Sequence, residues 1–153
     1  MSRIFLASGS PRRCELLRQL GFDFTQIVPN IREIRELSES AEVYVRRLAE
    51  EKAEAACQMT TESGLFLGAD TLISYEGQVF EKPNDELEHR SMLMQLSGQT
   101  HQVMTGIAVT NGIEIKSEVL ITEVEFSKLT LETIQNYWKT KEPQDKAGGY
   151  AIQ

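Results

Sequence analysis

The fold is decided by residues 3–21, which read RIFLASGSPRRCELLRQLG. A short apolar run at residues 3–7 meets a loop of small residues, and leucines then recur at helical spacing. Ser10 suits the N-cap of that helix, Pro11 its first position, and Gly21 the position just past its end. The stretch therefore predicts a strand, a tight loop and a helix.

The next elements alternate between strands and helices. A second strand is expected over residues 22–28, and apolar positions then trace one face of a long helix over residues 40–57. Residues 65–74 form a near-continuous apolar run, which is typical of a strand covered on both sides. Glu76-Gly77 indicates a turn into a short strand at residues 78–80.

Two further helices are marked by their ends. Asn84 or Asp85 suits the N-cap of a helix that stops at Gly98, and a last helix follows Thr130. The first prediction rests on a capping residue before a run of apolar residues at helical spacing, and the second on the apolar residues Ile134, Tyr137 and Trp138.

A hairpin is predicted between these two helices. Its signal is Asn111-Gly112, where we expect a type I′ turn because both central positions of that turn need a positive φ. Its strands are expected over residues 101–110 and 113–126. Interleaved strands and helices followed by a long antiparallel ribbon predict an α/β domain with a mixed sheet.

The composition describes an acidic chain that can fill a core. Its 153 residues carry 16 Lys and Arg against 23 Asp and Glu, a net charge of −7, and 41% are hydrophobic. This favours a single domain over residues 1–153 and excludes disorder. The negative charge argues against a nucleic-acid partner, and no apolar run approaches bilayer length. Two cysteines are too few for a disulfide framework, so we expect a cytoplasmic protein with no membrane partner.

Arg12 and Arg13 stand in the first turn of the first expected helix, where the helix dipole disfavours cations. A helix N-terminus after a loop of small residues binds phosphate readily, and two guanidinium groups would add donors. The loop lacks the glycine patterns of the common nucleotide-binding motifs. Two solvated arginines at a helix end therefore stay open as the alternative.

Lys52 and Asp70 are charged residues at positions where burial is expected. Helical spacing places Lys52 on the apolar face of its helix, where it either covers the helix edge with its aliphatic stem or serves a site. Asp70 is the only charge in its apolar strand, and a buried carboxylate needs a cation, a metal or several donors. Ligands bind beyond the carboxyl ends of strands in open α/β sheets, so we favour a functional role for Asp70 over structural pairing.

Two more charged residues lie in loops. Glu33, within the charged stretch at residues 32–36, is either a second functional carboxylate or a surface residue, and Lys82 lies in the rigid loop Glu81-Lys82-Pro83. Cations and carboxylates without a nucleophilic cysteine, a histidine base or a zinc cluster fit metal-assisted hydrolysis of a phosphate ester or anhydride.

Six fragments, in register from end to end, resemble the Maf family of nucleoside triphosphate pyrophosphatases. They are LASGSPRR (6–13), EKA (51–53), GADT (68–71), EKP (81–83), LSG (96–98) with His101 and Thr105, and DKAGGYAIQ (145–153). The resemblance implies an elongated mixed sheet flanked by helices, in two lobes with a cleft between them. It also implies a house-cleaning enzyme that cleaves a nucleoside triphosphate between the α and β phosphates. The double arginine, the EKP fragment and the ending GYAIQ look like the branch that acts on dTTP and UTP, including modified uridine nucleotides.

The resemblance assigns the catalytic roles. Asp70 would accept a proton from water and contact a divalent cation, Mg²⁺ or Mn²⁺, with Glu33 as the second metal carboxylate. Lys52 and Lys82 would join Asp70 as catalytic residues because they neutralise the phosphates.

Other residues are implied to bind the substrate. Ser8, Arg12 and Arg13 would hold the triphosphate together with the two lysines, and one of the two arginines would help to select the pyrimidine base. The full set implied for substrate binding is Ser8, Arg12, Arg13, Thr71 and Gln153.

Family members continue past Gln153 with a strand-rich stretch and a closing helix, so we expect this chain to lack a C-terminal segment. The resemblance also suggests a homodimer. The alternative function is a catalytically impaired nucleotide-binding or regulatory protein linked to septum formation, the role after which the family is named.

Overall fold

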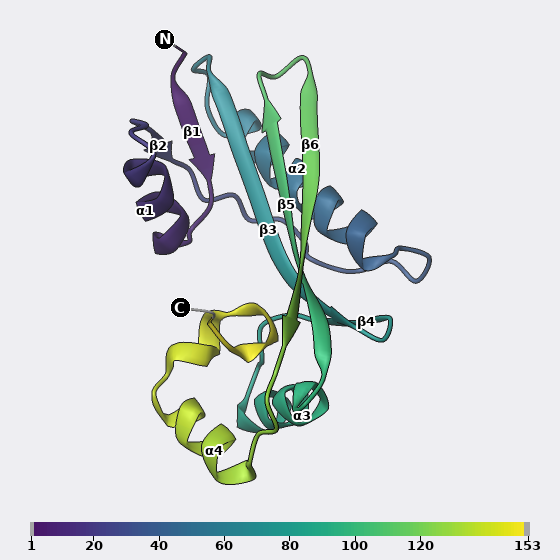
Figure 1. Ribbon diagram of the computed structural model, residues 1–153. Coiled ribbons are helices and arrows are strands. Elements are labelled where there is room, and N and C mark those ends of the chain that lie inside the picture. The colour runs from purple at the N-terminus through teal and green to yellow at the C-terminus, as the bar shows by residue number, and fades with distance from the viewer. Residues whose placement is uncertain (1, 152–153) are drawn as a thin grey trace. The chain divides into compact units, whose positions relative to one another are not determined.

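The computed structural model describes residues 2–151 and contains four α-helices and six strands within that range (Figure 1). No helix in this range is long and apolar enough to cross a membrane. The elements, in chain order, are β1 Ile4–Ala7, α1 Pro11–Gln19, β2 Thr25–Gln26, α2 Ala41–Gln58, β3 Leu65–Tyr75, β4 Gln78–Phe80, α3 Glu86–Leu96, β5 Thr100–Thr110, β6 Ile115–Glu125 and α4 Leu131–Lys139, followed by two 3₁₀ turns, Glu142–Asp145 and Ala147–Gly149.

The strands form one mixed sheet in the order β2-β1-β3-β5-β6, and β4 pairs with β3 outside this path. β1 runs parallel to both β2 and β3, with Leu6 opposite Leu67 and Ala7 opposite Gly68. β4 runs antiparallel to β3. The predicted α/β class with a mixed sheet is confirmed.

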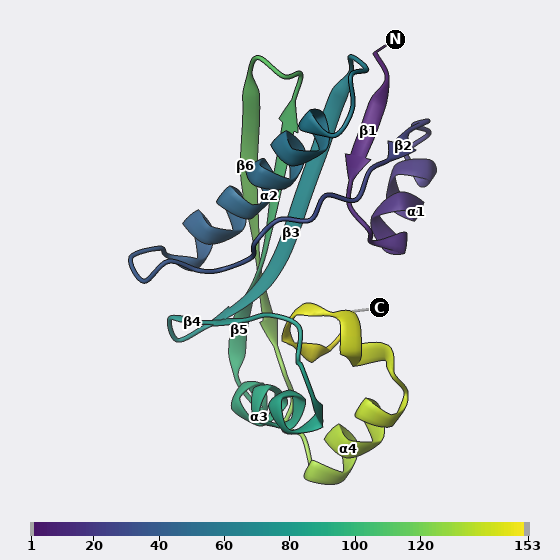
Figure 2. The same cartoon turned by 180° about the vertical axis from the view of Figure 1, so that it is seen from behind.

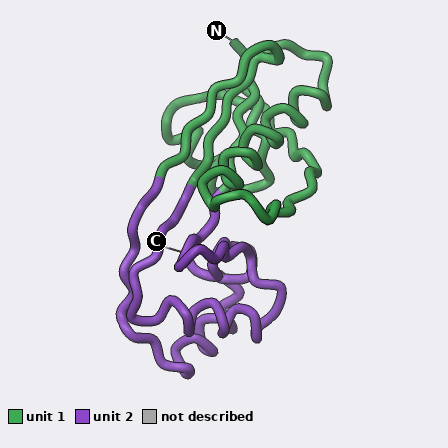
Figure 3. The backbone as a smooth tube through the Cα atoms, turned by 90° about the vertical axis from the view of Figure 1, so that its right-hand side faces the viewer, with its two compact units in different colours: residues 1–70, 105–120 green, residues 71–104, 121–153 purple. Residues whose placement is uncertain are grey.

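The chain divides into two compact units (Figure 3). Unit 1 comprises residues 1–70 and 105–120, and unit 2 comprises residues 71–104 and 121–153. The backbone therefore passes from one unit to the other within β3, β5 and β6.

In unit 1, helix α2 lies across one face of β3 and β5 (Figure 2). Two glycines permit this close approach. A Cβ on Gly68 would collide with the Ala49 carbonyl oxygen and lie 2.6 Å from the Ala53 nitrogen, and a Cβ on Gly106 would lie 2.5 Å from the Val45 carbonyl oxygen. Small side chains on α2 and bare backbone on the strands therefore set the distance between helix and sheet.

Unit 2 has a core of its own. Ile73, Phe80, Met92 and Leu96 are buried together, and Tyr150 packs against them. Helix α3 packs against α4 and against the second 3₁₀ turn. Two buried histidines hold the chain that follows α4: His89 Nε2 lies 2.9 Å from the Gly149 carbonyl oxygen, and His101 Nε2 lies 2.6 Å from the Tyr150 hydroxyl.

The predicted N-cap at Ser10 is confirmed, and all four α-helices within residues 2–151 begin at a capping side chain. The side chains of Ser10, Ser40, Asp85 and Thr130 each accept a hydrogen bond from the backbone nitrogen three residues further on. Gly21 follows the end of α1 with a φ of 83°. For α3 the structure selects Asp85 over Asn84 as the N-cap.

The predicted second strand is too long. Only Thr25 and Gln26 pair with β1. Phe22 instead donates its backbone N–H to the Leu17 carbonyl and closes the end of α1, while the Arg18 guanidinium lies 5.5 Å from the centre of the Phe24 ring. The first part of the expected strand therefore completes the helix before it.

The predicted type I′ turn at Asn111-Gly112 is wrong. β5 and β6 are joined by four residues, 111–114, and the Asn111 side chain accepts hydrogen bonds from the backbone nitrogens of Ile113 and Glu114. That side chain organises the loop without a positive φ at Asn111. A tight turn with two positive φ values occurs instead at Glu76 (48°) and Gly77 (79°), between β3 and β4.

Candidate active site

The loop between β1 and α1 is held by Ser8 and Arg13. Ser8 is buried, and its Oγ accepts hydrogen bonds from the Ser10 backbone nitrogen at 3.1 Å and from Arg13 Nη1 at 3.2 Å. Arg13 Nη1 also donates to the Ala69 carbonyl oxygen at 3.1 Å. The first turn of α1 is thus tied to β3 directly before Asp70.

Lys52, Asp70 and Glu33 form the centre of the candidate site. Lys52 Nζ lies 2.7 Å from Asp70 Oδ1 and 2.7 Å from Glu33 Oε1. The Lys52 and Asp70 side chains are 16% and 15% exposed, whereas the Glu33 side chain is 47% exposed. One largely buried ammonium group therefore bridges a strand carboxylate and a loop carboxylate.

Burial controls the electrostatics of this cluster. It raises the pKa of Asp70 above its ordinary value; Lys52 opposes the rise and Glu33 adds to it. Burial also lowers the pKa of Arg13, against the opposing effect of Asp70 and Glu33. A raised pKa makes the Asp70 carboxylate a stronger base than an ordinary aspartate, which suits it to accept a proton.

The remaining predicted site residues are distributed over both units. Arg12 is exposed on α1 and has no hydrogen-bond or ion-pair partner among the described residues. Thr71 follows Asp70 on β3 and belongs to unit 2, as does Lys82, which is exposed after β4. Gln153 lies outside the described residues. Unit 1 therefore brings together Ser8, Arg13, Glu33, Lys52 and Asp70.

The donor set is compatible with a hard divalent cation. Glu33 and Asp70 each place an oxygen within 2.7 Å of the same ammonium nitrogen, so both carboxylates can face one small cation. No group of three or more His, Cys, Asp or Glu suited to a metal occurs within residues 2–151. Two carboxylates still suffice for Mg²⁺, which keeps several waters and takes its other ligands from phosphates.

A second pair of charged residues in unit 1 was not anticipated from the sequence. Glu39 is buried, and Arg47 of α2 binds its carboxylate. Local spacing indicates only the pair of Arg47 with Glu51, four residues further along α2. Glu39 precedes the N-cap of α2, and nothing in its sequence surroundings indicates that it is buried.

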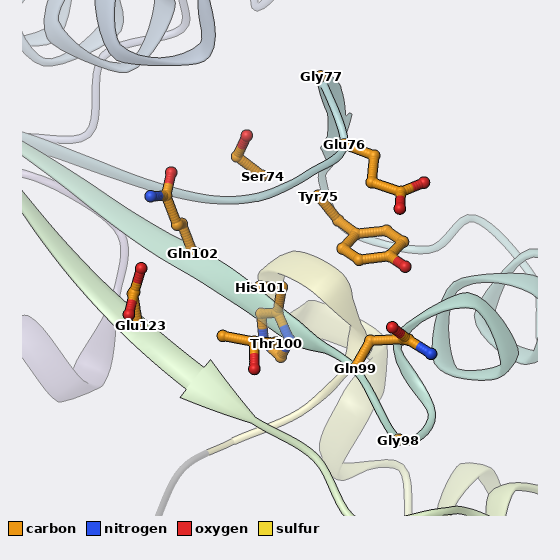
Figure 4. Close-up of a pocket in the computed structure, with 10 residues that line it drawn as sticks. All are labelled: Ser74, Tyr75, Glu76, Gly77, Gly98, Gln99, Thr100, His101, Gln102 and Glu123. Carbon is orange, nitrogen blue, oxygen red and sulfur yellow. The ribbon is translucent and has the colours of Figure 1, made fainter.

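Unit 2 contains a polar hollow of about 530 Å³ (Figure 4). It holds none of the predicted site residues. Thr100, His101 and Gln102 come from β5, and the turn at Glu76 and Gly77 forms another part of its wall. The complete lining is Ser74, Tyr75, Glu76, Gly77, Gly98, Gln99, Thr100, His101, Gln102 and Glu123.

Comparison with known proteins bears on this site. The sequence model of the Maf family, described as Maf-like protein, matches residues 3–153. The chain is 47% identical over 153 residues to a dTTP/UTP pyrophosphatase of Vibrio vulnificus (strain YJ016), covering 82% of that protein. It is 50% identical over the same 153 residues to a dTTP/UTP pyrophosphatase of Escherichia coli (strain UTI89 / UPEC), covering 78% of that protein.

A solved structure shares the fold. The Ham1 protein of Staphylococcus aureus superposes with a TM-score of 0.54 at 15% identity, covering 80% of this chain and 71% of that one. At this identity the likeness concerns the fold alone.

Proposed function

The chain belongs to the Maf family, and we propose on that premise that it is a nucleoside triphosphate pyrophosphatase that hydrolyses dTTP and UTP. The products are the nucleoside monophosphate and pyrophosphate. Relatives of 47% and 50% identity that carry this name support the substrate assignment. We extend the proposal to modified uridine nucleotides, and we place the enzyme in the cytoplasm, where nucleoside triphosphates are used.

The observation that carries the proposal is the contact of Lys52 with Asp70 and Glu33. Lys52 holds together two carboxylates that would otherwise repel each other, and two converging carboxylates are ligands that Mg²⁺ takes. The shared ammonium group keeps the two carboxylates close together until a divalent cation and the triphosphate enter. Asp70 then accepts the proton of the attacking water, a role supported by its raised pKa.

The phosphates are bound, in this proposal, at the N-terminus of α1. Its backbone N–H groups and the Ser8 hydroxyl are donors, and Lys52 supplies positive charge. Lys82 is assigned to the same triphosphate by the family resemblance. The expected homodimer is likewise proposed from the resemblance.

The two arginines receive different roles. Arg13 is hydrogen bonded to Ser8 and Ala69, so it stabilises the loop and presents its charge to the phosphates. Arg12 is exposed, and we assign it to recognition of the pyrimidine base, together with Thr71 and Gln153.

A divalent cation, Mg²⁺ or Mn²⁺, fits Glu33 and Asp70 as its protein ligands. When bound, it would neutralise charge on the phosphates and favour breakage of the anhydride. Glu33 and Asp70 would meanwhile orient the substrate complex, and Lys52 would shift its contacts toward the phosphate oxygens.

The test is pyrophosphate release by the 153-residue chain with Mg²⁺ or Mn²⁺. The substrates are dTTP, UTP, CTP, ATP, GTP and 7-methyl-GTP, and the control variant is Asp70→Asn. We expect turnover of dTTP and UTP above the others, and a loss of about 100-fold or more in kcat for Asp70→Asn, because the amide cannot accept the proton.

Two results would contradict the proposal. Asp70→Asn with unchanged kcat would remove Asp70 from the reaction. A folded chain that binds dTTP without turnover would favour the nucleotide-binding or regulatory alternative.

A further inference from the structure

Glu33 lies in a segment without regular structure. Residues 31–39, all of them described, contain no helix or strand, and the Glu33 side chain is 47% exposed. A carboxylate in such a loop samples many positions unless other contacts hold its backbone. The 2.7 Å contact with Lys52 therefore needs a second point of support.

That support begins with Glu39 at the end of the loop. Glu39 is 8% exposed, and both of its carboxylate oxygens are bound. Oε1 accepts hydrogen bonds from the Glu36 backbone nitrogen at 2.9 Å and from Arg47 Nη2 at 2.6 Å, and Oε2 accepts one from Arg47 Nε at 2.8 Å. These bonds lower the pKa of Glu39 to about 2, so the carboxylate is ionised at neutral pH.

Arg47 extends the support to the residue beside Glu33. Its Nη2 also donates to the Ile34 carbonyl oxygen at 2.8 Å. The guanidinium lies 5.4 Å from the centre of the buried Tyr44 ring and pairs with Glu51. These two further contacts fix the orientation of the Arg47 side chain. Arg47 therefore touches the loop at its end and next to Glu33.

Helix α2 thus holds the loop at two places. Lys52, five residues after Arg47 on the same helix, binds the Glu33 side chain, and Arg47 binds the backbone at Ile34. At the far end of the loop, Arg35 donates from Nε and Nη2 to the Glu39 carbonyl oxygen at 3.1 and 2.8 Å. The side chain and the backbone of the Glu33 region are fixed to one rigid element.

We propose that Glu39 and Arg47 are positioning residues that hold Glu33 in place beside Lys52 and Asp70. This inference rests on the proposed function, because it makes the arrangement of the catalytic carboxylates depend on the pair. Neither residue touches the substrate. The pair acts on the reaction only through Glu33.

The experiment must separate positioning from stability, because removing one partner leaves the other charge buried and unpaired. The variant is therefore Glu39→Met combined with Arg47→Met, which replaces both charges by apolar groups of similar length. The control is Arg46→Met on the same helix, whose guanidinium binds Ser117 on β6 instead of the loop. Urea unfolding is measured for each protein.

We expect the double methionine variant to lower kcat by about 10- to 100-fold with little change in KM, whereas Arg46→Met leaves kcat near that of the parent. The decisive comparison repeats the variant in a Glu33→Gln background. If the pair acts through Glu33, the double methionine change costs nothing further there. An equal loss of kcat in both backgrounds would overturn the proposal, since the pair would then act elsewhere.

Amide hydrogen exchange of residues 32–36 gives a readout that does not require turnover. We expect faster exchange in the double methionine variant than in Arg46→Met, because the Glu36 N–H loses its acceptor. Unchanged exchange would overturn the proposal, whether or not the parent protein releases pyrophosphate. Absence of pyrophosphate release by the parent protein would separately contradict the proposed function. Should the double variant lack a cooperative urea transition, Arg47→Lys replaces it, because lysine keeps the charge and loses the simultaneous contacts with Glu39 and Ile34.

Discussion

The ammonium group of Lys52 lies 2.7 Å from one oxygen of Glu33 and 2.7 Å from one oxygen of Asp70. At the scale of single residues, this arrangement explains why a lysine occupies the apolar face of α2. Its aliphatic stem packs with the helix, and its charge reaches the two carboxylates. The same charge is available to a triphosphate.

We expect Lys52→Met to weaken triphosphate binding more than monophosphate binding. The triphosphate carries more negative charge and loses a charge-assisted hydrogen bond to the lysine. We therefore expect the Kd for dTTP to rise by about 10- to 100-fold. Calorimetric titration of dTTP and dTMP in an Asp70→Asn background, which prevents hydrolysis, measures both constants.

The matched control for this titration is Lys116→Met. It removes the same charge from the exposed strand β6 and should leave both constants unchanged. Equal losses for dTTP and dTMP in Lys52→Met would place Lys52 away from the outer phosphates.

At the residue scale, the sequence alone indicates that Lys52 and Asp70 need partners, and the structure pairs them with each other. Both are charges in periodic apolar elements, so the pattern itself indicates that they need partners. Glu33 lies in a loop without periodicity, and the sequence left its role open. Glu39 and Arg47 meet across eight residues through a loop conformation that no local pattern encodes.

At the scale of elements, the close contact of α2 with β3 brings Lys52 to Asp70. Gly68 stands two residues before Asp70, and its missing side chain lets Ala49 and Ala53 of α2 approach the strand backbone. A longer distance between helix and strand would break the 2.7 Å contact at Asp70. The glycine in the GADT motif therefore has a packing role of its own.

We expect Gly68→Ala to destabilise the protein by about 1–3 kcal/mol, because its Cβ would collide with helix backbone that has no room to move. The free energy of unfolding in urea measures the effect, and kcat should fall as α2 is displaced. Gly9→Ala is the control for stability, since its Cβ would lie 3.5 Å from the nearest atom of Val28, an ordinary contact. Equal stability of the two variants would refute the packing argument.

The elements that the sequence predicted well are those with capping residues and long apolar patterns. α1 and α3 begin at predicted N-caps, α2 and α4 lie where helices were expected over 40–57 and after Thr130, and the strand expected over 65–74 is β3. The failures concern the length of the second strand and the type of turn between β5 and β6. The two positive φ values occur at Glu76 and Gly77, although Asn111-Gly112 has the stronger local preference, because the Asn111 side chain offers its loop an alternative set of hydrogen bonds.

At the scale of the whole molecule, unit 2 is distinguished by two buried histidines. His89 and His101 each bind the chain after α4 through Nε2, and neither Nδ1 has a partner among the described residues. Burial lowers the pKa of both side chains below their ordinary value; for His89, the Gly149 carbonyl and Glu86 oppose the shift. Both imidazoles are therefore neutral in the folded protein at pH 7.

This arrangement predicts a loss of stability in mild acid. As the pH is lowered, histidines of the unfolded chain bind protons at an ordinary pKa of about 6.5, whereas those of the folded chain bind protons only at lower pH. The free energy of unfolding is therefore highest above about pH 6.5 and falls as the pH decreases below it. Urea unfolding between pH 7.5 and 5, followed by the fluorescence of the single tryptophan, Trp138, measures the trend. The Trp138 ring lies 5.1 Å from the His89 ring and so reports on unit 2.

His101→Gln should reduce the slope of stability against pH over this window. The amide can still hydrogen bond to the Tyr150 hydroxyl and does not titrate. An unchanged slope in this variant would assign the acid sensitivity to other groups.

The passage of the chain between the two units also has a consequence for synthesis on the ribosome. Helix α2 packs against Gly106 and Ala108, which are made only after residues 71–104 have been added. At roughly 5–20 residues per second, that interval lasts a few seconds. During this interval, the apolar face of α2 and one edge of β3 lack their partner strand, β5. The nascent chain therefore exposes a surface that chaperones can bind before unit 1 is complete.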